Sequence, residues 1–325
     1  MLYPFVFKPI FQERIWGGRN INTLYRKDLP GQVSIGESWE VSDRPEAQSE
    51  IVNGPLAGKT IHWLMQLHTA ELMGTARPLN GRFPLLVKIL DAQQKLSLQV
   101  HPPASKAQQL GGEPKTEIWY ITHAPPGAEL YVGLRKNVSR AEFELKIRDG
   151  SVAECFHRIP VKAGDAMFLP SGRVHAIGAG LVIFEIQQNS DTTYRVFDWN
   201  RVDVQGKPRP LHVEQSLECI DFNDFEPGAV RADLPEAEEA NVHLQTLVED
   251  PLFIVETVSL LPPAHIDYTL TVPLVLGMVE GKATVLHETH PVELSPGQFC
   301  LVPAALENIK IEATSRAKLL VARPG

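Results

Sequence analysis

The stretch from Gly164 to Arg195 constrains the fold of this chain more than any other. It reads GDAMFLPSGRVHAIGAGLVIFEIQQNSDTTYR, in which Pro170 and Gly172 stand between two runs of β-favouring residues. Proline fixes φ and glycine tolerates positive φ, so these residues predict a tight turn between two strands. His175 should therefore begin a strand and point into the interior of a barrel. That position is typical of a metal ligand.

Two upstream runs, LSLQVHP and PKTEIWYI, supply partners for this histidine. In the first run, apolar residues alternate with Ser97, Gln99 and His101, so a strand would place these three polar side chains on one face. In the second run, Lys115 and Glu117 are two positions apart and share a face for the same reason. We expect both faces to look inward onto one polar site.

Gln99, His101, Glu117 and His175 together offer one amide oxygen, one carboxylate and two imidazoles. This mixed set suits a borderline divalent ion such as Zn²⁺, and Mn, Fe, Co and Ni remain open. A structural zinc site would usually contain cysteine, and none is near in the sequence. The pattern therefore predicts a metal with an open coordination position. The alternative is a metal-free barrel whose interior polar residues satisfy one another.

The composition of the chain limits the kinds of molecule that it can bind and the compartment in which it is expected. The 325 residues carry a net charge of -8, and their Lys and Arg residues are scattered, which argues against nucleic acid as a partner but permits a small anionic substrate. Three cysteines, Cys155, Cys219 and Cys300, are widely spaced with no CxxC pair, which favours a reducing compartment. The prolines near the N-terminus argue against a signal peptide, and the apolar runs are too short to span a bilayer. We expect a cytoplasmic protein with no membrane partner.

Helical patterns are few. One helix is predicted within GKTIHWLMQLHTAELMG, residues 58–74, where apolar residues repeat at helical spacing and Gly74 ends the run. Its histidines, His62 and His68, are expected to be structural or exposed. A second helix is predicted over 140–149, because Ser139 and Glu142 form a capping-box pattern and Gly150 follows.

The C-terminal part repeats the central pattern. Residues 225–240 are rich in Pro and Glu and predict a linker between a catalytic domain, 1–224, and a β-domain, 241–325. In the latter, LSPGQFCLVPAALENIKI echoes VKAGDAMFLPSGRVHAIG but has no histidine at the expected position. We therefore predict an all-β chain with a few short helices and two barrels, of which the second is degenerate and binds no metal. His287 and His290 are expected on an exposed hairpin.

These motifs resemble a known family. GDAMFLPSGRVHAIG is similar to the second signature motif of the cupins. LSLQVHP, PKTEIWYI and EIQQNSDTTYRVFDW together resemble the type I mannose-6-phosphate isomerases of the short bacterial form. The resemblance runs from about Trp16 to Arg201 and continues more weakly into the C-terminal barrel. It implies two cupin, or jelly-roll, barrels, and one zinc ion per chain held by the first of them. The implied ligands are Gln99, His101, Glu117 and His175.

The resemblance also implies an activity, the interconversion of mannose 6-phosphate and fructose 6-phosphate through an enediolate intermediate, and functional roles for Lys115, Asp191 and Arg195. Lys115 suits proton transfer near a dication, with a salt bridge as the alternative. Asp191 could orient a proton-transfer group or serve as one, with a turn or cap role as the alternative. Arg195 suits substrate oxygens or phosphate, with an ordinary ion pair as the alternative. Ser97 is expected to contact substrate or to fill the barrel. No single residue is assigned as the base.

Other functions remain open at this point. A cupin of this kind could isomerise another sugar or act as an oxygenase, and a non-catalytic cupin could only bind a phosphosugar. A full set of four ligands and the Asp191–Arg195 pattern favour isomerisation. The expected partner is a small sugar phosphate, and the chain is expected to be a monomer or a homodimer.

Overall fold

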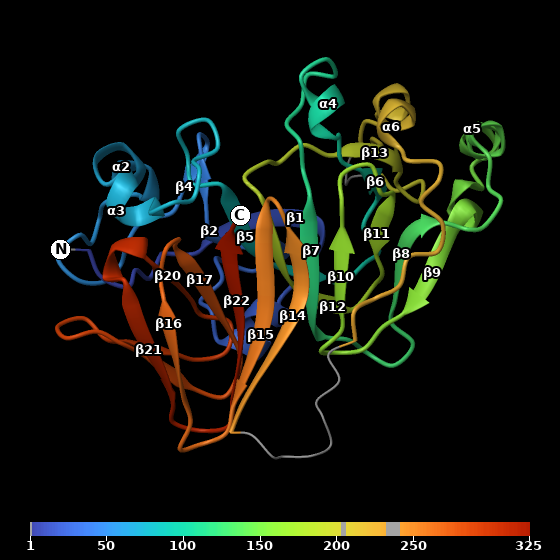
Figure 1. The fold of residues 1–325 in the computed structure, drawn as a ribbon. Coiled ribbons are helices and arrows are strands. Elements are labelled where there is room, and N and C mark those ends of the chain that lie inside the picture. The colour runs from blue at the N-terminus through green and yellow to red at the C-terminus, as the bar shows by residue number, and fades with distance from the viewer. Residues whose placement is uncertain (1, 203–205, 232–240) are drawn as a thin grey trace.

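The computed structural model describes residues 2–202, 206–231 and 241–325 (Figure 1). The described chain is mostly β, with short helices around the sheets, as the sequence predicts. The strands of residues 241–325, orange and red in Figure 1, lie beside the strands that come before them in the sequence. None of the helices in the described ranges is long and apolar enough to cross a membrane.

The first sheet has six antiparallel strands, and its central strands β2, β5 and β12 are buried on both faces. In β12, Phe184 belongs to the apolar core shared with the C-terminal part, whereas Ile183 belongs to a core on the opposite side. Burial on both faces explains why the sequences of β5 and β12 are largely apolar. In sheet order the strands are β1 (Ile10–Gly18), β2 (Ile35–Val41), β5 (Leu85–Ala92), β12 (Leu181–Gln188), β7 (Glu117–His123) and β10 (Ala166–Leu169).

The second sheet has five antiparallel strands and carries three of the polar residues that the sequence analysis selected: Gln99, His175 and Arg195. His175 begins β11 and lies opposite Gln99 of β6, and Arg195 of β13 is paired with Gln99 on the other side. In sheet order the strands are β13 (Tyr194–Phe197), β6 (Leu98–Val100), β11 (His175–Ile177), β8 (Glu129–Leu134) and β9 (Phe156–Pro160). A two-stranded ribbon, β3 (Asp43–Arg44) and β4 (Ala47–Gln48), lies apart from it.

The C-terminal part contains two further antiparallel sheets around an apolar core. Cys300 and Met278 belong to this core and are fully buried. One sheet has the order β14 (Val242–Asp250), β15 (Phe253–Leu260), β22 (Ala317–Pro324), β17 (Leu274–Glu280) and β20 (Phe299–Val302). The other has the order β16 (His265–Thr269), β21 (Asn308–Ala313), β18 (Ala283–Leu286) and β19 (Val292–Leu294).

The predicted sequence repeat has a structural counterpart. Gly164 and Gly297 both have a positive φ, +94° and +79°, and each comes shortly before a strand, β10 or β20, that leads to a proline. Counting from that proline, His175 at the start of β11 corresponds to Asn308 at the start of β21. Asn308 is exposed, whereas His175 is buried.

The helices are short, and one prediction about them was wrong. The helix over 140–149 is confirmed: Ser139 accepts a hydrogen bond from the Glu142 backbone N–H. The single helix predicted within 58–74 is instead two helices that meet at His68, whose φ of -133° and ψ of 30° interrupt the run. The helices are α1 (Asn20–Tyr25), α2 (Ile61–Leu67), α3 (Thr69–Met73), α4 (Ala104–Ala107), α5 (Arg140–Asp149) and α6 (Val213–Cys219), with 3₁₀ turns η1 (Val152–Cys155) and η2 (Ala304–Leu306).

The two parts of the chain share one core. The ring centroids of Phe184 and Phe299 lie 5.0 Å apart, and the backbone of Phe5 exchanges two hydrogen bonds with Leu301 of β20. The described part of the predicted linker, 225–231, runs along the first part, where Val230 pairs with Ala166. The rest of that predicted linker, 232–240, lies outside the described residues.

Candidate metal centre and substrate cavity

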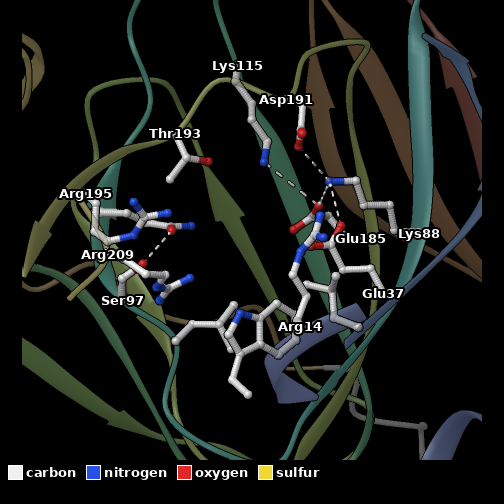
Figure 2. Close-up of a pocket in the computed structure, with 14 residues that line it drawn as sticks. Arg14, Glu37, Lys88, Ser97, Lys115, Glu185, Asp191, Thr193, Arg195 and Arg209 are labelled. Carbon is white, nitrogen blue, oxygen red and sulfur yellow. Dashed lines mark hydrogen bonds and ion pairs between the residues drawn. The ribbon is translucent and has the colours of Figure 1, made fainter. Parts of the chain in front are cut away.

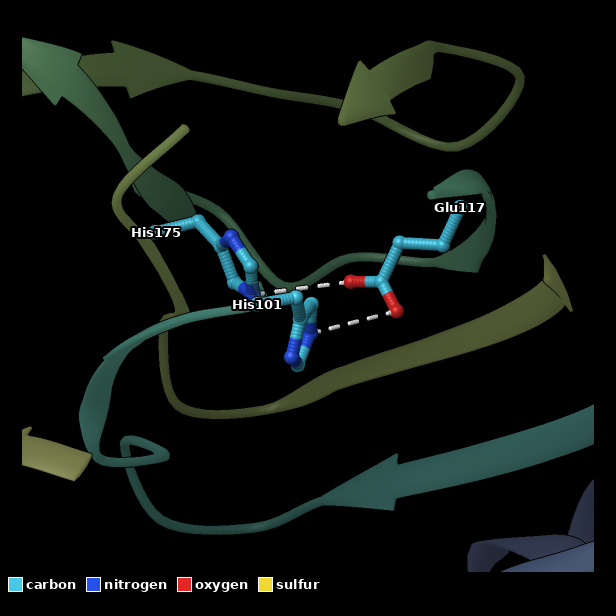
Figure 3. A group of neighbouring side chains, drawn as sticks. All are labelled: His101, Glu117 and His175. Atoms are coloured by element: carbon cyan, nitrogen blue, oxygen red, sulfur yellow. Dashed lines mark ion pairs between the residues drawn. The ribbon is translucent and has the colours of Figure 1, made fainter. Parts of the chain in front are cut away.

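Three predicted ligands meet in the space between the first and second sheets. His101 directly follows β6, Glu117 is the first residue of β7, and His175 is the first residue of β11. The predicted turn at Pro170 and Gly172 is present, and Gly172 has a φ of +91°. Each ligand thus lies at a strand end, where the flanking strands fix its direction (Figure 3).

The facing atoms of the cluster are two imidazole nitrogens and one carboxylate. Nε2 of His101 lies 3.5 Å from Oε2 of Glu117, and Nε2 of His175 lies 3.5 Å from Oε1 of the same carboxylate. One ligand atom from each residue lies within 4.8 Å of the other two. These separations leave space between the three atoms for an ion with metal–ligand bonds of about 2.0–2.2 Å.

The other ring nitrogen of each histidine fixes the ring orientation. Nδ1–H of His101 donates to the carbonyl of Thr192 at 2.8 Å, and Nδ1–H of His175 donates to the carbonyl of Arg173 at 2.9 Å. A carbonyl can only accept, so both Nδ1 atoms carry the proton when the imidazoles are neutral. Both Nε2 lone pairs therefore face the carboxylate, which is the arrangement of metal-binding histidines.

The surroundings of the cluster lower the pKa of all three donors. Burial and then the neighbouring His101 lower the pKa of His175 to about 3. The pKa of His101 is also lowered, first by burial and then by Lys115. Burial acts to raise the pKa of Glu117, but Lys115 and His101 outweigh it and hold that pKa well below its usual range.

Two of these donor atoms lack hydrogen-bond partners in the described part of the chain. Among the described residues, Nε2 of His101 and Oε1 of Glu117 are buried atoms without a hydrogen-bond partner. Leaving such atoms unsatisfied is costly, and a cation would satisfy them. Two neutral imidazoles and a carboxylate form the nitrogen and oxygen donor set of a borderline divalent metal, so the residues fit the predicted metal.

Gln99, the fourth predicted ligand, is beside the cluster. Its amide Nε2 lies 3.3 Å from Nε2 of His175, and its Oε1 accepts a hydrogen bond from the Ser97 hydroxyl at 3.2 Å. The side chain therefore reaches the cluster with its nitrogen end. Exchange of the two amide atoms by a half-turn would bring the oxygen to the same place.

A cavity of about 300 Å³ opens next to the cluster (Figure 2). Gln99 and Lys115 line it, so the predicted metal ligands and the cavity share a wall. Residues from both sheets contribute, and most are polar or charged. The lining comprises Arg14, Trp16, Glu37, Lys88, Leu90, Leu96, Ser97, Gln99, Lys115, Glu185, Asp191, Thr193, Arg195 and Arg209.

Lys115 lies where the sequence predicts it, next to the predicted ligand Glu117. Its Nζ is 2.9 Å from Oε2 of Glu117 and 4.0 Å from Oε1 of Glu185, and the side chain is almost fully buried. Asp191 lies on the same side of the cavity as Lys115, where its carboxylate is 3.8 Å from Nζ of Lys88 and remains half-exposed. Figure 2 shows both side chains pointing into the cavity.

Arg195 approaches the cavity from β13 without a carboxylate partner among the ion pairs of the described residues. Its Nε is buried and has no hydrogen-bond partner there, and another guanidinium nitrogen donates to the carbonyl of Pro210. Burial and then Arg209 lower the pKa of Arg195. Arg209, in contrast, holds Asp198 by two hydrogen bonds of 2.7 and 2.6 Å. The cavity therefore contains a guanidinium whose charge is free to bind an anion.

The sequence analysis did not predict a network of buried charges in the cavity wall. Nζ of Lys88 lies 3.3 Å from Glu185 and 3.6 Å from Glu37, and Arg14 donates to Glu37 at 2.7 Å. Burial opposes ionisation of Glu37, but Lys88 and Arg14 together lower its pKa to about 2. The pKa of Glu185 is raised, mainly by burial and then by Glu117. A charged residue inside an apolar strand, as in FPLLVKIL and GLVIFEI, was the available signal.

The four other histidines considered in the sequence analysis lie outside the metal cluster and the cavity lining. His62 pairs with the buried Asp43 at 3.0 Å, and His68 pairs with the exposed Glu71 at 2.7 Å, so both are structural as expected. His287 and His290 stack on each other between β18 and β19, with ring centroids 6.0 Å apart.

Known proteins resemble this chain along its whole length. The model of the catalytic domain of type I phosphomannose isomerases matches residues 5–115. The probable mannose-6-phosphate isomerase GmuF of Bacillus subtilis is 35% identical over 317 residues, which cover 97% of this chain and 98% of that protein. A mannose-6-phosphate isomerase of Streptococcus mutans is 41% identical over 221 residues, 68% of each chain.

Solved structures agree with this relationship. The crystal structure of the mannose 6-phosphate isomerase from Bacillus subtilis superposes on this chain with a TM-score of 0.86 at 31% sequence identity and covers 99% of both chains. The predicted resemblance is thereby confirmed over nearly the full sequence. The chain belongs to the type I mannose-6-phosphate isomerase family.

Proposed function

We propose that this protein interconverts mannose 6-phosphate and fructose 6-phosphate. The observation that carries the proposal is the buried cluster of His101, Glu117 and His175 beside a cavity that also contains Lys115 and Arg195. The cluster suits a metal, Lys115 suits proton transfer, and Arg195 suits an anion. The relatives named above carry the name of this isomerase.

The metal we propose is zinc, one ion per chain, with Gln99, His101, Glu117 and His175 as ligands. Two imidazoles, a carboxylate and an amide oxygen match the preference of Zn²⁺ for borderline donors. When bound, the ion would polarise the carbonyl of the sugar and stabilise negative charge on its oxygens. Lys115 would compensate the Glu117 carboxylate on the side that faces the cavity, since its Nζ lies 2.9 Å from Oε2.

The proton transfer between C1 and C2 is assigned to the groups that line the cavity next to Gln99. Lys115 is placed to hold or donate a proton to a sugar oxygen, because its Nζ is within 4.0 Å of two carboxylates and lines the cavity. Asp191 would orient a proton-transfer group or itself transfer a proton. No single residue is assigned as the base.

The phosphate of the sugar is assigned to Arg195. A guanidinium stays charged and forms two parallel hydrogen bonds to phosphate oxygens, and its Nε has no other hydrogen-bond partner among the described residues. Ser97 lines the same part of the cavity and would add a hydroxyl contact. These two residues would select a phosphorylated sugar over a neutral one.

We further infer the organisation that surrounds this site. The proposed arrangement is a catalytic cupin barrel within 1–224, a linker over 225–240 and a degenerate second barrel over 241–325. The sheet pairs and the glycines Gly164 and Gly297 at equivalent positions support it. The chain is proposed to act as a monomer or homodimer in the cytoplasm. Its three buried free cysteines are consistent with a reducing compartment.

Isotope exchange tests the proposed reaction. The protein loaded with zinc is incubated with mannose 6-phosphate in deuterated water, and the products are followed by proton NMR. Proton transfer through an enediolate predicts fructose 6-phosphate with deuterium at C1. Glu117→Gln should abolish the conversion, whereas Glu129→Gln, at the start of β8 and outside the cavity lining, should retain it. Zinc-loaded protein that binds the sugar phosphate without conversion or exchange would contradict the proposal and favour a binding role.

A further inference from the structure

The turn between β10 and β11 contacts both histidine ligands. The backbone N–H of Gly172 donates to the carbonyl of His101 at 2.9 Å, and the carbonyl of Arg173 accepts from Nδ1–H of His175 at 2.9 Å. Two consecutive residues of this turn thus hold the backbone of the first ligand and the ring of the second. Any movement of the turn would change the separation and orientation of the two imidazoles.

The side chain of Arg173 links this turn to Asp224 and to strand β10. Its Nε and one terminal nitrogen bind the two carboxylate oxygens of Asp224, each at 2.8 Å, and the other terminal nitrogen donates to the carbonyl of Phe168 in β10 at 2.8 Å. All three guanidinium nitrogens are therefore engaged. The side chains of Arg173 and Asp224 are only 17% and 15% exposed, so water screens this pair less than it screens a surface pair.

The partner Asp224 is itself held in place. Its carbonyl accepts from the backbone N–H of Leu134 at the end of β8, and the carbonyl of Leu134 accepts from Glu226. Three residues earlier, the N–H of Asp221 donates to the carbonyl of Gly172 at 2.9 Å. A Cβ at Gly172 would lie 3.1 Å from the carbonyl oxygen of Cys219, so the segment packs closely against the turn.

From these contacts we infer that the Arg173–Asp224 ion pair is a positioning device for the metal ligands. It fixes the turn that orients His175 and holds His101, and thereby sets the affinity for the metal. Neither side chain is among the predicted ligands or lines the substrate cavity. The inference deepens the proposed function and rests on its metal site.

The expected decrease in metal affinity can be judged from other groups that hold metal ligands in place. Loss of a group that orients a metal-bound histidine typically lowers metal affinity 10- to 100-fold. Here the orienting carbonyl belongs to the backbone and stays, and only its fixation is removed. We therefore expect a decrease near the lower limit, about tenfold.

Metal titration tests the inference directly. Metal-free wild type, Asp224→Asn and Arg173→Lys are titrated with zinc in competition with a chromophoric chelator, and their cobalt forms are compared by visible absorption. Asp224→Asn keeps the shape of the side chain but loses its charge. Arg173→Lys keeps the positive charge but loses the guanidinium that forms two parallel hydrogen bonds to the carboxylate. Both should bind zinc about tenfold more weakly, with a changed cobalt spectrum.

The same sheet offers a matched control. Arg158 binds Glu129 with two hydrogen bonds of 2.9 and 2.6 Å, but Arg158 is largely exposed and neither residue contacts a ligand or the turn. Glu129→Gln should therefore leave the zinc affinity and the cobalt spectrum unchanged. Thermal unfolding of each metal-free protein measures the purely structural contribution of each pair.

The outcomes separate this inference from the proposed function. If wild type binds no zinc, the proposed metal site fails. If wild type binds one zinc and Asp224→Asn binds it equally well with the wild-type cobalt spectrum, the positioning inference is wrong, even if the metal-free variant is less stable. Should Asp224→Asn fail to fold, Arg173→Lys decides by the same criterion.

Discussion

Nζ of Lys88 in β5 lies 3.3 Å from Oε1 of Glu185 in β12, and both side chains are buried in the wall of the substrate cavity. Glu37 lies 3.6 Å from the same ammonium. Burial alone would lower the pKa of Lys88, but Glu185 and Glu37 outweigh it and raise that pKa. The positive charge of Lys88 thus offsets part of the free-energy cost of burying the two carboxylates in the first sheet.

Replacing Lys88 should therefore destabilise the fold. Lys88→Met leaves Glu37 and Glu185 buried without their shared cation, and breaking a buried pair typically costs about 3–5 kcal/mol. Urea unfolding of the metal-free protein measures the change. Lys136→Met, which removes a 73% exposed lysine from its pair with Glu226, should cost less than about 1 kcal/mol. Equal losses for the two variants would show that the network contributes no more than a surface pair.

Lys115 should be needed for turnover and dispensable for zinc. Lys115→Ala removes the ammonium 2.9 Å from Glu117 but leaves all four proposed ligands in place. General acid or base groups typically contribute 10²–10⁴-fold, so we expect kcat to fall by at least about 100-fold. Zinc content and the dissociation constant for mannose 6-phosphate are measured alongside. Loss of zinc together with activity would instead assign Lys115 a structural role.

The stability of the metal-free protein should depend on pH through His175. Its folded pKa is about 3, because of burial and then His101, and an unfolded chain restores it to about 6.5. Between these values the unfolded chain binds one more proton, so the free energy of unfolding falls as the pH decreases. One proton contributes a slope of about 1.4 kcal/mol per pH unit. Urea unfolding between pH 6.5 and 4.5 should show a shallower slope for His175→Asn, and an unchanged slope would contradict the assignment.

Arg195 should discriminate phosphorylated from neutral sugars. Arg195→Lys keeps a positive charge but loses the fork, and a hydrogen bond to a charged group is worth about 1.5–3 kcal/mol. We expect kcat/KM for mannose 6-phosphate to fall roughly 10- to 100-fold, the kinetic equivalent of that energy. The residual activity on mannose should change much less. A proportional decrease for both sugars would place Arg195 at the reacting carbons and away from the phosphate.

Local patterns in the sequence predicted those parts of the site that depend on neighbours along the chain. The turn at Pro170 and Gly172 places His175 at the start of β11, and a spacing of two puts Lys115 beside Glu117. The helix from 140 to 149 follows from its capping residues, which also lie within one turn of it. Such features need only the periodicity and the dihedral preferences of single residues.

Other parts were not predictable because they depend on pairing between distant segments. A charge in an apolar strand indicates a buried partner, but the sequence does not say that Lys88 faces Glu185 or that Arg173 binds Asp224. The core shared by Phe184 and Phe299 is likewise a contact between segments far apart in the chain. The break at His68 arises where an apolar helical pattern continues across two helices, so the pattern alone does not reveal it.

The measurement that tests the account most directly is a coupled assay of the conversion of mannose 6-phosphate to fructose 6-phosphate. It is made on protein loaded with metal, on the same protein after chelation, and again after zinc is returned. The account predicts that turnover disappears with the metal and returns with one zinc per chain. Turnover that persists in protein shown to be free of metal, or its absence in both directions with zinc bound, would contradict it.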